Sequence, residues 1–297
     1  MSFIATAEPR PQPPTLTVGE RSMAFGDRAY VMGVVNVTPD SFFDGGDYWK
    51  TDAAVDRALQ LQAAGADIID VGGESTRPGA DPVSVDDELH RVIPVIEALR
   101  RHSDVWISVD TYKSEVAAAA INAGADIVND ISGLGFDDQM AHVVADAGCG
   151  LVVMHIRRTP KTMQQQIRYD DLLGEIRAYF EHRVQRALDA GVKPSRIVLD
   201  PGIGFGKRVH HNYQLLRDLG RFTDLGHPLL VGTSRKSFIG SVLDAPPRDR
   251  QWGTAATVAC ALFAGADIVR VHDVEAMTEV TRVCEAICAM AGPGANR

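Results

Sequence analysis

The sequence predicts an α/β protein consisting of a single (β/α)8 TIM barrel preceded by a short N-terminal hairpin. Short β-rich apolar runs alternate with longer Ala-rich segments of helical periodicity, one Ala-Gly-Ala-Asp junction recurs, and every predicted strand ends in a polar residue. A chain of 297 residues, 45% hydrophobic and 23% charged, can bury the core of one such domain.

The first residues predict a leader and a hairpin. Residues 1–14 contain four prolines, which disfavour helix and sheet, so we expect a flexible leader before a barrel domain at 15–297. Apolar runs at 16–18 and 23–25 flank Gly19 and predict two short strands. Such a hairpin could plug the floor of the barrel.

Eight apolar runs predict the strands of the barrel. They cover residues 31–35, 67–71, 105–109, 126–128, 151–154, 196–199, 229–232 and 267–271. An open doubly wound sheet could be built from the same units, but it would usually begin with a glycine-rich phosphate loop, and none follows the first run. The closed barrel is therefore the preferred interpretation.

An internal repeat supports this count of strands. Its copies lie at 64–69, 123–128 and 264–269, and shorter copies lie at 146–148 and 189–191. In each copy the glycine stands where a helix would end in a left-handed cap, before the chain turns into a buried strand.

Polar side chains follow all eight predicted strands. In chain order they are Asn36, Asp70 and Glu74, Asp110, Asn129 and Asp130, His155, Asp200, Ser234 with Arg235 and Lys236, and Arg270 with His272. Any one of them could be a helix cap. Because parallel strands bring their carboxyl ends to one rim, where barrel enzymes carry their sites, the whole set predicts an active site.

The composition of this set indicates the kind of substrate. The basic members follow the last two strands, where barrels often bind phosphate, and would gather positive charge there: Arg235, Lys236, Arg270 and His272. The earlier strand ends add hydrogen-bonding groups: Asp110, Asn129 and Asp200. This division fits a ligand with an anionic end and a polar heteroaromatic end.

Four segments resemble the motifs of the dihydropteroate synthase family and occur in the family's order. They are 36–42 (Asn-Val-Thr-Pro-Asp-Ser-Phe), 70–79 (Asp-Val-Gly-Gly-Glu-Ser-Thr-Arg-Pro-Gly), 200–207 (Asp-Pro-Gly-Ile-Gly-Phe-Gly-Lys) and 234–237 (Ser-Arg-Lys-Ser). The similarity extends from about residue 31 to the C-terminus. It implies condensation of 6-hydroxymethyl-7,8-dihydropterin pyrophosphate with p-aminobenzoate, with release of pyrophosphate, in folate synthesis.

The resemblance also implies a role for each matching residue. It assigns the pterin contacts to Asp110, Asn129, Asp200 and Lys236. It assigns the diphosphate to Arg270 and His272, with Ser234 as a further substrate contact, and the mobile second loop to Thr76 and Arg77. Asn36 would touch a pyrophosphate-bound Mg²⁺. The residues expected to act in catalysis are Asp110, Asp200, Lys236, Arg270 and His272.

Simple chemistry agrees with this assignment. Breaking the carbon–oxygen bond leaves positive charge on the pterin methylene and negative charge on the leaving group, which Mg²⁺, Arg270 and His272 can stabilise. Buried carboxylates such as Asp110 and Asp200 can bind the guanidine-like edge of the pterin. No covalent nucleophile is required.

Some motifs also have simpler interpretations. Residues 38–41 could form a helix N-cap or a lid that excludes water. His155 could be a general base or a structural group, and His210 with His211 is better explained as structural or surface. The spacing of the glycines at 202–206 is too short for a dinucleotide fingerprint, and close approach to a flat ligand explains them.

The chain departs from the common family pattern at several positions. Arg157 and Arg158 replace a short polar-Gly pair, and Arg158 could either obstruct the pterin side of the rim or point to solvent. Phe43 and Arg208 also differ. A catalytically silent paralogue is therefore an alternative, and a methyltetrahydrofolate-dependent methyltransferase is a third, against which the matches at 234–237 and 76–77 argue.

Composition restricts partners and location. The net charge of −9 argues against nucleic acid as a partner. No apolar run approaches the roughly 18 to 20 residues of a membrane span. At the N-terminus, no apolar segment follows basic residues as it does in a secretion signal. The four cysteines show neither disulfide nor zinc spacing. We therefore expect a cytoplasmic protein.

The family implies a homodimer through late helices, for which the apolar run 280–291 is a candidate. It also makes sulfonamide- or sulfone-type analogues plausible ligands.

Overall fold

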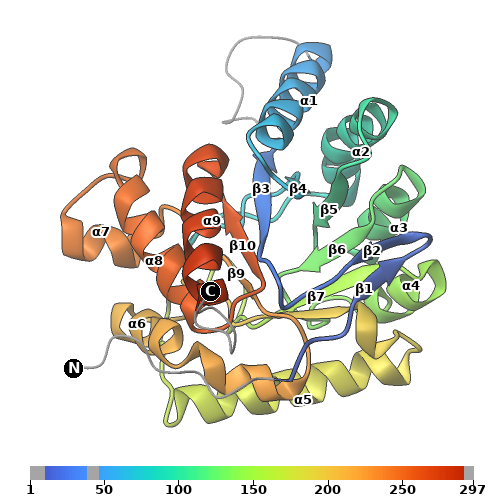
Figure 1. The fold of residues 1–297 in the computed structure, drawn as a ribbon. Helices are drawn as coiled ribbons and strands as arrows, with labels where there is room; N and C mark the ends of the chain where they lie inside the picture. The colour runs from blue at the N-terminus through green and yellow to red at the C-terminus, as the bar shows by residue number, and fades with distance from the viewer. Residues whose placement is uncertain (1–10, 39–46, 291–297) are drawn as a thin grey trace.

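The computed structural model describes residues 11–38 and 47–290. It confirms the predicted (β/α)8 barrel, with the helices outside the strands (Figure 1). The barrel strands are β3 (Tyr30–Asn36), β4 (Ile68–Gly72), β5 (Trp106–Asp110), β6 (Ile127–Asp130), β7 (Gly150–Met154), β8 (Ile197–Asp200), β9 (Leu230–Val231) and β10 (Ile268–Val271). They are parallel in the order β8-β7-β6-β5-β4-β3-β10-β9, and a parallel bridge between Leu199 and Leu229 joins the two ends of this order.

The α-helices follow the strands in alternation. They are α1 (Asp47–Ala63), α2 (Val85–His102), α3 (Ser114–Asn122), α4 (Met140–Ala147), α5 (Leu172–Asp189), α6 (Val209–Arg217), α7 (Ser237–Leu243), α8 (Gln251–Phe263) and α9 (Val274–Met290). Short 3-10 helices cover Pro194–Arg196, Leu219–Leu225 and Pro247–Asp249. Among the residues described, each helix is too short or too polar to cross a bilayer.

Helix α2 shows how the sequence specifies these elements. The hydroxyl of Ser84 accepts from the backbone N–H of Asp87 at 3.1 Å and caps the first turn. Val92, Ile96 and Leu99 recur at helical spacing and are fully buried against the strands. The cap and the apolar stripe thus fix where the helix begins and which face it buries.

Two apolar layers hold the barrel together. A large cluster lies between the strands and the surrounding helices and includes Val31 and Val35 of β3. A smaller cluster at the floor contains Met32 of the same strand, as the alternation of side chains along a strand requires. Leu16, Met23 and Phe25 of the N-terminal segment complete this floor, packing with Met32, Ile68, Ile127, Val152, Val198, Leu230 and Ile268.

The predicted hairpin is present, but its second strand lies two residues earlier than expected. β1 (Leu16–Val18) pairs antiparallel with β2 (Arg21–Met23). Gly19 has a φ of 58°, as a two-residue hairpin turn requires, and such a turn starts the return strand at once. Phe25, predicted within the strand, is instead buried beyond its end and packs edge-to-face on Tyr30, with ring centroids 5.6 Å apart.

The last part of the predicted leader contacts the segment that follows this hairpin. The side-chain amide of Gln12 donates to the carbonyl of Phe25 at 2.9 Å, and Pro13 is buried. The leader residues 1–10 lie outside the described ranges.

The repeated junction has a defined role at the floor. Each glycine has positive φ, as predicted for a helix end: 104° at Gly65, 115° at Gly124 and 99° at Gly265. Each aspartate accepts a 2.9 Å hydrogen bond from the first amides of a neighbouring strand segment: Val31 N to Asp67, Ile107 N to Asp126 and Leu229 N to Asp267. The carboxylates thus satisfy strand amides buried at the barrel floor.

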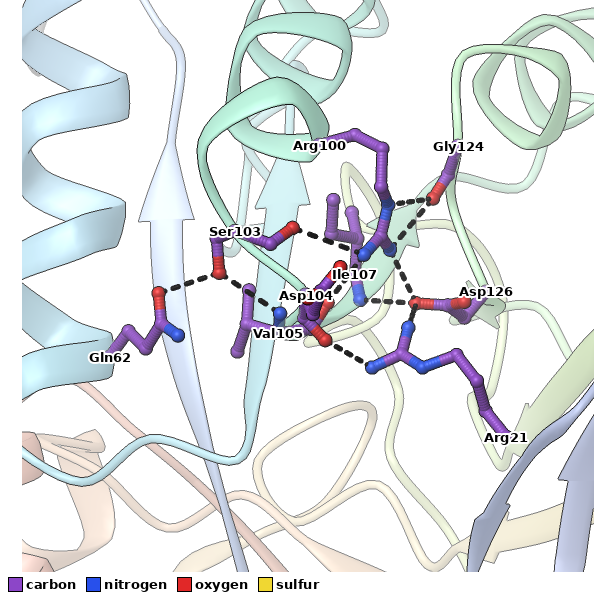
Figure 2. A network of polar contacts seen from close by, with 9 residues as sticks. All are labelled: Arg21, Gln62, Arg100, Ser103, Asp104, Val105, Ile107, Gly124 and Asp126. Carbon is purple, nitrogen blue, oxygen red and sulfur yellow. Dashed lines mark hydrogen bonds and ion pairs between the residues drawn. The ribbon is translucent and has the colours of Figure 1, made fainter.

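Asp126 also ties the hairpin to α2 (Figure 2). Its Oδ2 accepts from Arg21 Nη1 at 2.6 Å and from Arg100 Nη2 at 2.7 Å. The Arg21 guanidinium lies over the ring of Trp106, 4.4 Å from its centroid, while Arg100 also donates to the carbonyl of Gly124. One carboxylate therefore joins a strand, a helix and the hairpin that covers the floor.

Candidate active site

A pocket at the carboxyl ends of the strands brings most of the predicted residues together. It contains about 420 Å³ of empty space, part of it open to solvent. It is lined by Thr76, Asp110, Asn129, Ile131, Met154, Asp200, Phe205, Gly232, Ser234, Lys236, Arg270 and His272. Eight of the ten residues assigned from the sequence are in this lining, and Asn36 and Arg77 are not.

Strand register sets the polar wall of the pocket. Asp110 ends β5 directly opposite Asn129 of β6, and Asp200 ends β8 opposite Met154 of β7. The three polar side chains are almost fully buried, with 7%, 3% and 5% of Asp110, Asn129 and Asp200 exposed. A ligand that reaches them must therefore give up most of its water and gain hydrogen bonds in exchange.

The glycine-rich segment after β8 closes around this wall. Asp200 Oδ1 accepts from the backbone N–H of Gly202 at 2.7 Å. Gly202 has a φ of 65°, and a Cβ there would collide with the carbonyl oxygen of His155. Lys236 Nζ donates to the carbonyl of Ile203 in the same segment. Close packing against the backbone of His155 therefore explains Gly202, whereas the sequence had suggested close approach to a flat ligand.

Arg270 is bound by two carboxylates rather than standing free. Its Nε donates to Asp70 Oδ2 at 2.6 Å, and its Nη2 donates to Asp110 Oδ2 at 2.7 Å. Burial works against the charged form, but the charges of Asp70 and Asp110 prevail and raise the pKa of Arg270 above its ordinary range. The guanidinium is therefore cationic and already paired.

The expectation that Arg235 adds positive charge to the pocket is wrong. Its guanidinium pairs with Asp273 through two bonds, of 2.9 Å from Nε and 2.5 Å from Nη2, and it is not in the pocket lining. Its φ is 58°, and its backbone N–H donates to Thr254 Oγ1 at 3.0 Å. The left-handed turn at Arg235 places its neighbours Ser234 and Lys236 in the pocket lining.

His272 also carries no charge at neutral pH, contrary to the expectation from the sequence. Burial, followed by the charges of Arg270 and Arg235, lowers the pKa of His272 to about 4. Its Nδ1 lies 2.9 Å from Ser234 Oγ, which also accepts from its backbone N–H at 3.1 Å. His272 can therefore offer the ligand a hydrogen bond but no cation.

Three other lining residues have shifted pKa values. Burial raises the pKa of Asp110 to about 7, an effect that Arg270 opposes. Burial also raises the pKa of Asp200, against the charge of Lys236. Burial lowers the pKa of Lys236 to about 8, although Asp200 opposes this shift. Acids and bases that titrate near neutrality in one pocket are typical of a functional site.

The segment after β4 supplies Thr76 and Arg77. Thr76 lines the pocket, whereas Arg77 is exposed at the rim. The charge of Arg77 still contributes to lowering the pKa of His272, so it lies within electrostatic range of the pocket.

Glu74, noted only as a polar strand end, anchors this segment. Its Oε1 accepts from the hydroxyl of Tyr112 at 2.7 Å. Its Oε2 accepts from the backbone N–H of Val83 at 2.9 Å and from Lys113 Nζ at 2.5 Å. Lys113 also pairs with the buried Glu88 of α2. Both ends of the loop that carries Thr76 are thereby fixed to the barrel.

Asn36 lies at the end of β3, half-buried and opposite Gly72 of β4. The predicted lid motif at 38–41 continues into residues 39–46, which are outside the described ranges. Within 11–38 and 47–290 there is no group of three or more His, Cys, Asp or Glu side chains that could hold a metal ion. The side chain of Asn36 carries an amide oxygen, a type of ligand that Mg²⁺ accepts.

His155, left open between two roles, has the contacts of a structural group. It is buried, it does not line the pocket, and its Nδ1 lies 2.9 Å from Lys207 Nζ. Burial and the charge of Lys207 lower the pKa of His155 well below its ordinary value. Lys207 also donates to the carbonyls of His155 and Phe205, at 3.2 and 3.0 Å. This pair ties the glycine-rich segment to the end of β7.

Sequence reasoning missed the apolar part of the lining. Ile131 and Met154 each adjoin a polar strand end, and that adjacency could have indicated them. Phe205 lies within the matched segment 200–207, and its ring centroid is 4.8 Å from Lys236 Nζ. These side chains give the pocket apolar surfaces that suit a flat ring.

Arg157 and Arg158 do not obstruct the pocket. The Arg157 guanidinium lies 3.9 Å from the centroid of the Tyr169 ring and pairs with Glu175. Arg158 is exposed and donates to Gln166 Oε1 at 3.1 Å. Neither lines the pocket, so of the two alternatives left open for Arg158 the structure supports the solvent-facing side chain.

Comparison with known proteins gives one consistent result. The family model described as pterin binding enzyme matches residues 32–272. Dihydropteroate synthase of Synechocystis sp. is 51% identical over 93% of this chain and 96% of its own length. The crystal structure of Yersinia pestis dihydropteroate synthase with a sulfonamide drug complex has 44% identity and a TM-score of 0.88, covering 93% of this chain and 99% of that one. The structure of Xanthomonas albilineans dihydropteroate synthase in complex with 7,8-dihydropteroate has 40% identity and a TM-score of 0.83, with the same coverage.

Proposed function

Because this chain belongs to the dihydropteroate synthase family of pterin-binding enzymes, we propose that it condenses 6-hydroxymethyl-7,8-dihydropterin pyrophosphate with p-aminobenzoate. The observation that carries the proposal is a single pocket in which buried carboxylates face a paired arginine and a neutral histidine. In the reaction the amine nitrogen bonds the pterin methylene as the carbon–oxygen bond breaks. The electron pair leaves with pyrophosphate, and the amine loses a proton.

Four residues form the proposed pterin subsite. Asp200 and Asp110 would accept hydrogen bonds from the guanidine-like edge of the ring, while Asn129 both donates and accepts. Lys236 lies beside Phe205 and can donate to a ring oxygen or nitrogen. The carboxylates also favour the positive charge that develops on the methylene carbon.

The leaving group would be held by the last strand. Arg270 supplies the fixed positive charge for the diphosphate, and neutral His272, oriented through Ser234, supplies a hydrogen bond. Thr76 in the lining and the exposed Arg77 next to it lie on the segment after β4 and would contact the second substrate or the diphosphate. Positioning and electrostatic stabilisation suffice for this reaction, so no nucleophile is assigned.

Mg²⁺ is the proposed cofactor, with Asn36 as its protein contact. The rim fits such an ion because an amide oxygen is a ligand that Mg²⁺ accepts, and a diphosphate can supply most of the others. When bound, the ion would neutralise negative charge on the departing diphosphate. Arg270 and His272 would act on the same group from β10, the strand that pairs directly with β3.

We also propose ligands and an assembly. Sulfonamide- or sulfone-type analogues would compete with p-aminobenzoate, on the strength of the Yersinia pestis complex with a sulfonamide drug. A homodimer would use exposed apolar side chains of α7, α8 and α9: Val242, Leu243, Trp252, Val283 and Ile287. Sedimentation equilibrium tests the dimer. The cytoplasmic location stays a prediction from the sequence.

No observation favours a silent paralogue or a methyltransferase. The paralogue hypothesis depended on departures from the family pattern. Arg157, Arg158 and Arg208 lie outside the pocket lining, and Phe43 lies outside the described residues. The relatives from Synechocystis sp. and Escherichia coli, matched over 93% and 86% of this chain, are both named dihydropteroate synthase.

The deciding measurement is pyrophosphate release by the purified protein with Mg²⁺, dihydropterin pyrophosphate and p-aminobenzoate. Asp200→Asn should lower both turnover and pterin affinity, because the buried wall loses a charged acceptor. Asp189→Asn, the same change on the exposed face of α5, is the matched control and should behave as wild type. Unchanged turnover and affinity in Asp200→Asn would contradict the assignment, and absence of pterin binding and turnover in the wild type would refute the function.

A further inference from the structure

Asp70 lies behind the pocket and contacts two residues of its lining. It is completely buried and is not itself in the lining. Its Oδ2 accepts from Arg270 Nε at 2.6 Å and from Asn129 Nδ2 at 3.2 Å. Asp110, by contrast, lines the pocket and binds the same guanidinium at 2.7 Å. Arg270 therefore bridges one inner carboxylate and one that faces the ligand.

This bridge competes with the substrate at both ends. In the proposed function, Asp110 binds the pterin and Arg270 binds the diphosphate, so each end of the substrate competes with the bond between them. A buried charge that loses its only partner is strongly destabilised. Because Asp70 has no access to ligand, it can stay bonded to Arg270 throughout.

Unused acceptors make the exchange possible. Asp70 Oδ1 and Asp110 Oδ1 are both buried and have no hydrogen-bond partner among the residues described. Arg270 has five N–H donors, of which Nε and Nη2 account for the bonds to these two aspartates. Asp110 can therefore accept a pterin N–H, and Asp70 can accept a further N–H of Arg270, without any new buried group losing a partner.

We propose that Asp70 is a positioning residue that keeps Arg270 paired while Arg270 exchanges Asp110 for the diphosphate, so that Asp110 becomes available to the pterin. The inference rests on the proposed function, since it assigns the two ends of the substrate to Asp110 and Arg270. It adds an inner carboxylate that never touches substrate yet sets how the two substrate ends bind.

The test measures the two ends of the substrate separately. Asp70→Asn removes the inner charge with almost no change in size, so Arg270 then depends on Asp110. Titration calorimetry should show that 6-hydroxymethylpterin, which has no diphosphate, binds about tenfold more weakly than to wild type. Inorganic pyrophosphate with Mg²⁺ should bind at least as tightly as to wild type, because Arg270 has lost one of its two carboxylate partners. General loosening of the site would instead weaken both ligands together, and that result would overturn the proposal.

A double-mutant cycle separates the route through Arg270 from the route through Asn129. In an Arg270→Gln background, Asp70→Asn should no longer change pterin affinity by more than about threefold. A persisting tenfold effect would overturn the proposal in favour of a role through Asn129. If Asp70→Asn does not fold, Asp70→Ser removes the same charge and carries the same predictions. If the wild-type protein binds both probes but shows no turnover, the synthase activity alone is refuted. If Asp70→Asn weakens the affinity for both probes together, the positioning role alone is refuted.

Discussion

Replacing Asp126 by alanine should destabilise the barrel from its floor, on the side opposite the pocket. The carboxylate of Asp126 accepts three hydrogen bonds through one oxygen, from the amide of Ile107 and from the guanidinium groups of Arg21 and Arg100 (Figure 2). Asp126→Ala removes all three at once. Arg100 retains its bonds to the carbonyls of Ser103, Val105 and Gly124, so it is not left unpaired.

The size of the effect follows from the burial of each partner. The amide of Ile107 is buried, and a buried donor left without an acceptor costs about 1–3 kcal/mol. The side chains of Arg21 and Arg100 are 30% and 25% exposed, and ion pairs of this kind contribute about 0.2–1 kcal/mol each. We expect a loss of about 2–4 kcal/mol in the free energy of unfolding. For 297 residues the unfolding entropy is about 0.6 kcal/mol/K, so Tm should fall by about 3–7 °C.

Urea denaturation at 25 °C measures this loss, with an unchanged slope indicating the same extent of unfolding. Asp126→Asn keeps an oxygen for the amide of Ile107 and should cost only about 1 kcal/mol. Asp104→Ala is the matched control at the same floor, because the side chain of Asp104 is exposed, and it should change stability by less than about 0.5 kcal/mol. If Asp126→Ala were as stable as Asp104→Ala, the capping role of the repeated aspartate would be refuted. The folded fraction of every variant should retain wild-type kcat.

Three further predictions concern the pocket and its rim. Gly202→Ala forces a Cβ against the carbonyl of His155 at a φ of 65°. The variant should therefore lose at least about 2 kcal/mol of stability and bind pterin more weakly, as denaturation and titration would show. A fully stable variant with wild-type affinity would contradict this. Arg158→Gly should raise the free energy of unfolding by about 0.5–1 kcal/mol, because Arg158 holds a φ of 65°; a loss of stability would be evidence against strain there. The pH profile of kcat/KM should be bell-shaped. Burial raises the pKa of Asp110 to about 7, so its required carboxylate form is lost as pH falls through that value. Burial lowers the pKa of Lys236 to about 8, so its required protonated form is lost as pH rises through that value. A rate independent of pH between 6 and 9 would disprove this assignment.

The sequence determined the barrel and the identity of most of its rim. Strand and helix periodicity is local, so the alternation of runs predicted all eight barrel strands, with every boundary within two residues of the observed one. The rim followed because parallel strands in a closed barrel must bring their carboxyl ends together. Asp110 and Asn129, 19 positions apart in the sequence, are neighbours for that reason alone.

Turn geometry limited the prediction of the hairpin. Hydrophobicity selected Met23 to Phe25 for its second strand, but the tight turn at Gly19 starts that strand at Arg21. Arg21 then reaches Asp126, a contact between residues 105 positions apart that no local pattern indicates.

Only the tertiary structure decided the charge states of the site. The basic residues after the last two strands predicted a positive pocket, yet Arg235 is neutralised by Asp273, His272 is neutral, and Arg270 is shared between Asp70 and Asp110. Residue type fixes which groups can carry charge. Whether they do so depends on burial and on partners up to 200 positions away along the chain, as for Arg270 and Asp70, and those are set only when the barrel closes.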